Sequence, residues 1–120
     1  MFRFEKFDVW QGAIEFADRV YAVSAKFPTD ERFGLTSQMR RASVSISSNI
    51  AEGSSRSSDA DFARFIEIGH GSLMETVSQS HIGKRQSFLL AEDFKDLYDR
   101  AERLSRMLSG LRSKLLGETR

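Results

Sequence analysis

The sequence predicts an all-α fold, an antiparallel up-down four-helix bundle, and three observations support this prediction. The 120-residue chain contains a single proline, Pro28, so long segments on both sides of it are free of that helix breaker. In four segments, apolar residues recur every three or four positions rather than every two. Four amphipathic helices joined by short connections pack most economically as an up-down bundle. We therefore treat residues 1–120 as one domain.

The first helix is predicted over residues 8–26 and carries two apolar stripes at helical spacing. One stripe consists of Val9, Phe16, Val20, Val23 and Phe27. The other consists of Trp10, Ile14, Ala17 and Tyr21. About a third of the circumference is enough to seat a helix on one core, so the second stripe is available for another molecule. This width is the main indication of self-association in the sequence.

The second helix is predicted over residues 36–53, after a turn that ends at Gly34. Its buried stripe consists of Leu35, Met39, Ala42, Ile46 and Ile50. Residues 44–47 also alternate as in a strand, but the helical spacing persists on both sides of them. Gly53, followed by a serine-rich connector, is interpreted as the stop of this helix.

Ser58 is the predicted N-cap of a third helix over residues 58–86. Its inner stripe consists of Phe62, Ile66, Gly69, Leu73, Val77 and Ser80. The fourth helix is predicted over residues 92–116 and opens with Glu92 and Asp93, whose charges suit a helix N-terminus. Its apolar face consists of Phe94, Leu97, Ala101, Leu104, Leu108, Leu111 and Leu115.

Composition excludes several classes of function. The chain has no cysteine, so it forms no disulfide, thiolate metal site or cysteine nucleophile. Its 18 basic and 17 acidic side chains give a net charge of +1, so binding to nucleic acid or lipid would depend on local patches. The charged N-terminus is neither a signal peptide nor a membrane span. We therefore expect a cytoplasmic protein without a membrane partner.

The middle of the chain carries a specific set of residues. They are Phe27-Pro28, Glu31, Gly34-Leu35, Gln38, Arg40-Arg41, Ser45-Ile46, Asn49-Ile50-Ala51-Glu52-Gly53, Gly71-Ser72-Leu73 and Glu75. With Trp10 in the first helix, this pattern resembles the bacterial four-helix-bundle family of 23S rRNA intervening-sequence proteins. The resemblance implies a homopentameric ring without catalysis. It also implies architectural roles for the motif residues Trp10, Pro28, Gly34, Asn49, Glu52 and Gly53.

A relative of this family, the accessory variability protein of diversity-generating retroelements, looks like a nucleic-acid-binding partner of a reverse transcriptase. The resemblance thus suggests RNA, DNA or a reverse-transcriptase-like protein as partners besides self. The chain departs from the family in two respects. Its nucleic-acid-binding relatives are strongly basic, whereas this chain is nearly neutral. Ser87 stands where the family tends to have glycine.

Arg40 and Arg41 have two possible roles. Paired arginines can bind phosphate, or they can pair with carboxylates such as Glu52 within the bundle or across a subunit contact. The structural role is favoured. Asn49 lies close to the buried stripe, so its amide needs hydrogen bonds and is expected to fix a helix end or the turn at Gly53.

Arg103, Arg106 and Lys114 make the end of the chain locally basic, which suggests contact with nucleic acid. The alternative is a solvated face on which acids pair with bases four residues later. The candidate pairs are Asp96 with Arg100, Asp99 with Arg103, and Glu102 with Arg106. The solvated face is favoured, and no aromatic platform for stacking bases is evident among these residues.

Glu67 and His70 match the Glu-x-x-His spacing of di-iron bundles, but His81, the only other histidine, lacks the second motif. No metal, cofactor or catalytic residue is therefore expected. We expect a non-enzymatic oligomeric assembly or binding module. The alternatives are a purely structural oligomer that binds no nucleic acid and, remotely, a metal-dependent bundle enzyme.

Overall fold

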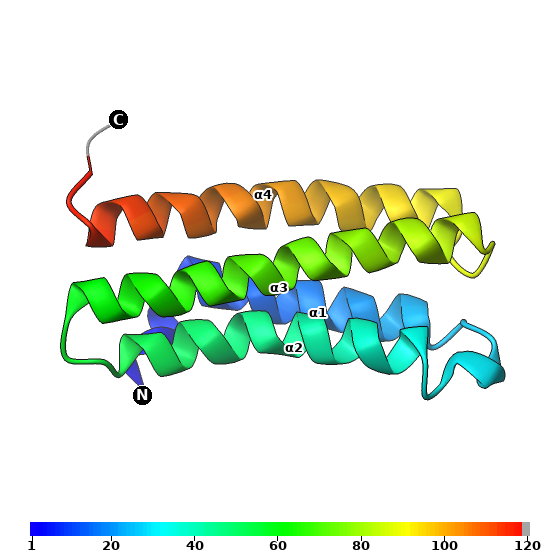
Figure 1. Ribbon diagram of the computed structural model, residues 1–120, viewed down its shortest axis with the longest axis horizontal. Helices are drawn as coiled ribbons and strands as arrows, with labels where there is room; N and C mark the ends of the chain where they lie inside the picture. The colour runs from blue at the N-terminus through cyan, green and yellow to red at the C-terminus, as the bar shows by residue number, and fades with distance from the viewer. Residues whose placement is uncertain (119–120) are drawn as a thin grey trace.

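The computed structural model describes residues 1–118 and, over that range, contains four α-helices, two short 3-10 helices and no strand. The α-helices are α1 (Asp8–Ser24), α2 (Leu35–Ser54), α3 (Asp59–Arg85) and α4 (Ala91–Leu115) (Figure 1). The 3-10 helices are η1 (Arg3–Lys6) and η2 (Thr29–Glu31). The largest difference from the predicted helix ranges is the end of α1, which lies at Ser24 rather than at residue 26.

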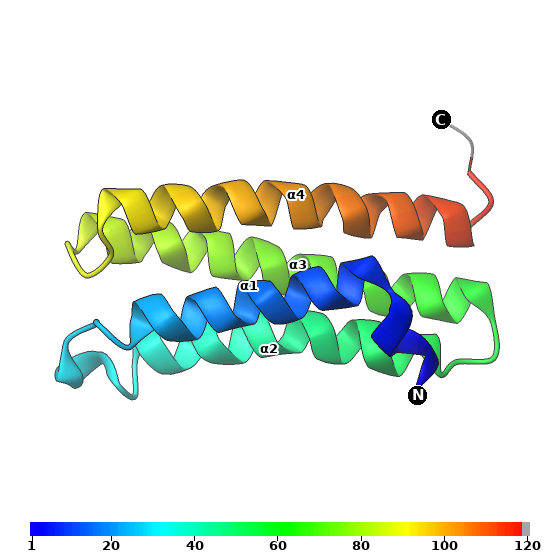
Figure 2. The ribbon, with the colours of Figure 1, turned by 180° about the vertical axis from the view of Figure 1, so that it is seen from behind.

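Successive helices lie side by side in opposite directions (Figures 1 and 2). The contacts between α3 and α4 illustrate the register. His81, near the end of α3, meets Phe94, near the start of α4, with ring centroids 4.9 Å apart. At the opposite end of the pair, Glu67 forms an ion pair with Arg112. No helix in the described range is long and apolar enough to cross a membrane.

The core lies between the four helices and follows the predicted apolar spacing. Every residue of the first stripe of α1 and of the predicted stripe of α2 is buried. On α3 and α4 the same holds for most of the predicted positions, while Val77, Phe94, Leu111 and Leu115 are half-buried at the edge of the core. Residues 44–47 are helical, which excludes the strand interpretation.

Glu31 caps the start of α2. Its Oε1 accepts a hydrogen bond of 3.1 Å from the backbone N–H of Leu35. A Cβ at Gly34 would lie only 3.0 Å from that oxygen, so the motif glycine leaves room for the capping carboxylate. Pro28, with a φ of −55°, precedes the short helix η2 that carries Glu31.

The ends of α2 and α3 differ partly from expectation. The interpretation of Gly53 as a helix stop is wrong, because Gly53 is buried inside α2, which continues to Ser54. Ser58 caps α3 as predicted, and its hydroxyl accepts a hydrogen bond from the N–H of Asp61. After α3, Ser87 adopts a φ of 65°, a left-handed conformation that favours glycine.

Candidate interaction surfaces

The second apolar stripe of α1 remains at the surface of the bundle. Trp10, Ile14 and Ala17 are half-buried, and Tyr21 is 45% exposed. The first stripe of the same helix is buried in the core. One face of α1 therefore holds the fold together, and the other presents apolar surface to the outside.

The N-terminal segment and α2 add further apolar residues to this surface. Before α1, the ring of Phe2 stacks on Phe4 and the ring of Phe4 meets Trp10 edge to face, with centroids 6.1 and 5.1 Å apart. Figure 2 shows this N-terminal segment close to the end of α2, and the Arg3 guanidinium donates to the Ser54 carbonyl there. On α2, Val44 is 40% exposed. We call these residues the α1 outer surface: Phe2, Phe4, Trp10, Ile14, Ala17, Tyr21 and Val44.

Arg40 joins α2 to the end of α1. Its Nε donates a hydrogen bond of 2.9 Å to the Ser24 hydroxyl, and its Nη2 donates to the Tyr21 carbonyl. The guanidinium also lies 4.6 Å from the centroid of the Tyr21 ring. Val44 follows Arg40 by four residues and therefore lies one turn further along the same face of α2. These contacts favour the structural role of Arg40.

Arg41 does not pair with Glu52 within the bundle, and pairing across a subunit contact stays a prediction. Eleven residues separate them, which is about 16 Å along a helix axis. Glu52 instead forms an ion pair of 2.8 Å with Arg56. Arg41 is exposed and has no ion pair within the described residues. It lines a polar cleft between α2 and α3 together with Gln38, Ala42, Ser45, Ser72 and Glu75.

The salt-bridged face expected on α4 forms only in part. Arg100 pairs with Asp96 at 3.1 Å, as predicted. Asp99, however, pairs with Lys95 at 2.7 Å instead of with Arg103. The expectation of three acid-first pairs on α4 is therefore wrong for two of them, since no ion pair joins residues 102 and 106 either.

Arg103, Arg106 and Lys114 are all exposed, and none has an ion pair with another residue of the range 1–118. Positions 103, 106, 110 and 114 are three or four residues apart and therefore share one side of α4. Gly110 adds no side chain between them. We call Arg103, Arg106 and Lys114 the α4 cationic strip.

Asp96 is the centre of an ion-pair network between α1 and α4. It contacts both Arg19 of α1, at 2.9 Å, and Arg100 of α4. Partial burial raises the pKa of the Asp96 carboxyl, but the hydrogen bonds from Arg100 and Arg19 outweigh this effect and hold that pKa below its ordinary value of 3.8. On the same helix, the hydrogen bond and charge of the Asp99 carboxylate raise the pKa of the Lys95 ammonium.

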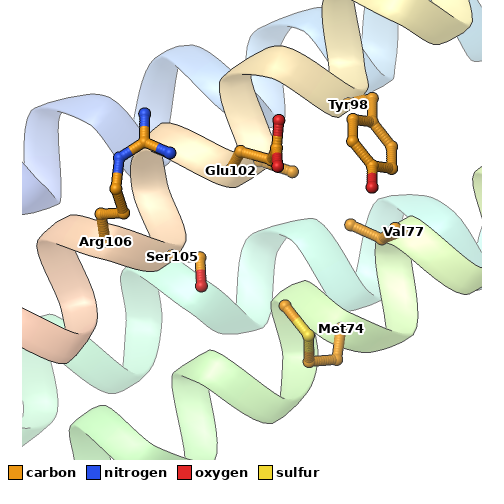
Figure 3. A pocket seen from close by; sticks show the side chains of 7 residues that line it. Met74, Val77, Tyr98, Glu102, Ser105 and Arg106 are labelled. Atoms are coloured by element: carbon orange, nitrogen blue, oxygen red, sulfur yellow. The ribbon is translucent and has the colours of Figure 1, made fainter.

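Three clefts follow one another along the seam between α3 and α4. The first, of about 440 Å³, is lined by Lys84, Ala91, Phe94, Lys95, Tyr98 and Asp99. The second, of about 300 Å³, shares Tyr98 and is lined further by Met74, Val77, Ala101, Glu102, Ser105 and Arg106 (Figure 3). The third, of about 180 Å³, contains Ile66, Glu67, His70, Leu108, Ser109 and Arg112. We call this row of clefts the α3–α4 groove.

The groove gathers aromatic side chains that sequence reasoning missed. Phe94 and Tyr98, one turn apart on α4, have centroids 5.8 Å apart, and both rings meet His81 of α3. The Lys84 ammonium lies 4.7 Å from the centroid of the Phe94 ring. The four-residue spacing of Phe94 and Tyr98 was visible in the sequence, but their proximity to His81 depends on how α3 and α4 pack.

Glu67 and His70, the two residues of the metal-type motif, are engaged with α4. Glu67 accepts from Arg112, and this contact raises the pKa of the Arg112 guanidinium. His70 Nε2 and the Ser105 hydroxyl share a hydrogen bond of 2.7 Å. Within residues 1–118, no three His, Asp or Glu side chains gather as they would around a metal ion. Both side chains therefore join α3 to α4.

Comparison with known proteins places the chain in a family. The family model described as 23S rRNA-intervening sequence protein matches residues 5–110. The chain belongs to the 23S rRNA-intervening sequence protein family. Among solved structures, it is similar to a protein of unknown function from the S23 ribosomal protein family of Bacteroides thetaiotaomicron, with a TM-score of 0.80 and 22% sequence identity. The similarity covers 87% of this chain and 97% of the other, and it shows a common fold. No curated protein matches the sequence significantly.

In this member of the 23S rRNA-intervening sequence protein family, several motif residues lie along the α2–α3 seam. The Asn49 amide donates to the Ser45 carbonyl and hydroxyl at 2.8 and 3.0 Å. The Ser45 hydroxyl bonds in turn to Ser72 of α3 at 2.9 Å. Ser45 therefore joins α2 to α3, and the Asn49 amide holds Ser45 within α2 rather than bonding to a helix end or to the turn after Gly53.

Proposed function

We propose that this protein is a non-catalytic, homo-oligomeric helical-bundle module that assembles through the α1 outer surface. The observation that carries the proposal is the half-exposed second stripe of α1 beside a fully buried first stripe. A monomer would leave that stripe in water, whereas contact with another copy would bury apolar area at about 25 cal/mol per Å². Self-assembly is therefore the use that best fits this surface.

A ring is the form of assembly that we propose. A contact between two different surfaces of identical chains closes into a ring when the rotation between copies permits it. The family resemblance implies five copies. The contacts of Glu67 and His70 with Arg112 and Ser105 support structural rather than metal-binding roles for these two residues.

Substitution on α1 tests the role of this surface. Ala17→Glu places a charge within the α1 outer surface and retains a good helix former. Ala22→Glu makes the same change at an exposed position of the same helix, about 140° around its axis. We expect sedimentation velocity to show loss of the oligomer for Ala17→Glu and an unchanged oligomer for Ala22→Glu. Equal behaviour of the two variants would remove the α1 outer surface from the proposal.

The α4 cationic strip favours a second candidate function, contact with RNA or DNA. Three unpaired cations on one side of a helix can neutralise phosphates, and a ring would present several copies of the strip. An enzyme that acts on nucleic acid, such as a reverse transcriptase, would then be a partner that binds the same RNA or DNA strand. If the purified oligomer binds no nucleic acid at low salt, the purely structural oligomer is the remaining function.

A further inference from the structure

The lining of the middle cleft of the α3–α4 groove combines apolar residues, an aromatic ring with a nearby hydroxyl, and two opposite charges. The apolar lining consists of Val77, Met74 and Ala101. Figure 3 shows the Tyr98 ring and the Ser105 side chain on α4 pointing toward α3, whereas the Glu102 carboxylate and the Arg106 guanidinium point away from α3, at the rim of the cleft. The volume of about 300 Å³ is at the lower end of the range for small-molecule sites.

Glu102 and Arg106 have hydrogen-bonding groups available for a ligand, although the Glu102 charge also acts on Lys95. They stand one turn apart on α4, the spacing at which an acid and a base commonly pair, yet no ion pair or hydrogen bond joins them or engages either with another residue of the described chain. The edge of the cleft therefore offers a carboxylate that only accepts hydrogen bonds and a guanidinium that only donates them. A simple anion would use only Arg106, and a simple cation only Glu102.

A nucleotide has groups that match each part of this lining. Its base can stack on the 39%-exposed Tyr98 ring beside the apolar residues, and its phosphate can bind Arg106. Guanine is the base that suits Glu102, because its N1–H and N2 amine are two adjacent donors for the two carboxylate oxygens. Adenine, cytosine and uracil each place an acceptor next to a donor on the corresponding edge, and that acceptor would face the carboxylate.

We propose that the middle cleft of the α3–α4 groove binds a guanine nucleotide unit. Glu102 accepts from the base edge, Tyr98 stacks on the base and Arg106 binds the phosphate. The Ser105 hydroxyl, held by His70, has hydrogen-bonding capacity left for the ribose. The site does not require self-assembly. It rests on the second candidate function, contact with RNA or DNA, only if the nucleotide is part of a strand.

Calorimetric titration of the full-length protein with single nucleotides tests the base preference. We expect GMP to bind at least roughly tenfold more tightly than AMP, and IMP, which lacks the N2 amine, to lose most of that advantage. Glu102→Gln should abolish the preference, because a neutral amide no longer offers two acceptors. Asp18→Asn removes the same charge at an exposed position of α1 outside the cleft and should leave the preference intact.

Two further variants separate the other contacts. Tyr98→Ala should weaken GMP binding, whereas Tyr98→Phe, which keeps the ring, should retain it. Arg106→Ala should reduce the affinity for GMP but not that for guanosine. Saturable binding of GMP and AMP with equal affinity, or a guanine preference that persists in Glu102→Gln, would overturn the proposal.

A labelled single-stranded uridine oligonucleotide with one central guanine distinguishes a free nucleotide from a strand. If GMP and the oligonucleotide both fail to bind saturably, the proposal is wrong whatever the oligomeric state. If only the oligonucleotide binds, and binds more tightly than its adenine counterpart, the ligand is a guanine within a strand. Strand binding without base preference would support the α4 cationic strip and contradict the guanine site.

Discussion

Gly53 of α2 and Phe65 of α3 are in direct contact, because a Cβ added at position 53 would lie 2.7 Å from the Phe65 Cβ. The Cβ added at position 53 would also lie 2.9 Å from Cδ1 of Phe62. The two helices can approach this closely only because position 53 carries no side chain. The motif glycine thus fixes the distance between α2 and α3 at one end of the bundle.

We expect Gly53→Ala to lower the free energy of unfolding by about 1–3 kcal/mol, since the two phenylalanines and the backbone must shift. Gly110→Ala is the matched control, because nothing lies within 4 Å of a Cβ at that position of α4. The control should raise stability by up to about 1 kcal/mol through helix propensity. Urea unfolding measures both. A Gly53→Ala protein as stable as wild type would show that the helices can separate without cost.

Ser87→Gly should stabilise the protein. The φ of 65° costs a non-glycine residue roughly 1–2 kcal/mol, part of which is offset by the greater unfolded-state entropy of glycine. The expected net gain is about 0.5–1 kcal/mol in urea unfolding. Ser55→Gly, at a position with a φ of −89°, should bring no such gain. A loss of stability for Ser87→Gly would indicate that the serine side chain contributes more than its backbone costs.

The Asp96 network makes stability depend on pH. The pKa of Asp96 is lowered by folding, so the folded state favours the ionised carboxylate and the stabilisation is present above the ordinary value of 3.8. It is lost as the pH falls through the lower, folded-state pKa. Because the carboxylate is 38% exposed, Asp96→Asn should cost at most about 1 kcal/mol at neutral pH.

Urea unfolding at neutral pH and at about pH 2.5 tests this pH dependence. The difference between wild type and Asp96→Asn should shrink at the lower pH, because protonation of the wild-type carboxyl removes the charge that the network stabilises. Asp18→Asn, at an exposed carboxylate without an ion pair in the described range, should show little difference at either pH. A difference that grows on acidification would contradict the sign of the shift.

The helices and most of the core could be predicted because they depend on local spacing. A residue such as Ile46 repeats the apolar period of its own helix, and its burial follows from that period alone. The role of Gly53 in α2 could not be predicted in the same way. Gly53 resembles a helix stop until the position of Phe65, on another helix, is known.

Side-chain partners were harder to predict than helices. Asp99 has a base four residues away on each side, and the spacing does not decide whether it pairs with Lys95 or with Arg103. The α3–α4 groove brings together residues from distant parts of the chain, such as Met74 and Tyr98, so no local pattern reveals it. The contacts of Glu67 and His70 with Arg112 and Ser105 likewise depend on how α3 packs against α4.

If the α4 cationic strip binds nucleic acid, replacing Arg103, Arg106 and Lys114 together by alanine should weaken binding to single-stranded RNA and flatten its salt dependence. Each lost phosphate contact reduces the slope of log K against log salt by about 0.7, so the triple variant should lose about 2. Arg85→Ala, an exposed cation at the end of α3, is the control and should have little effect. An unchanged slope in the triple variant would place any binding elsewhere.

The most direct test of self-assembly is the mass of the wild-type protein, measured by size-exclusion chromatography with light scattering. We expect a single species well above the 13.6 kDa of one chain, close to 68 kDa if five copies close a ring. Absorbance of the same peak at nucleic-acid and protein wavelengths would show whether RNA or DNA accompanies it. A species of 13.6 kDa at every concentration would contradict assembly through the α1 outer surface.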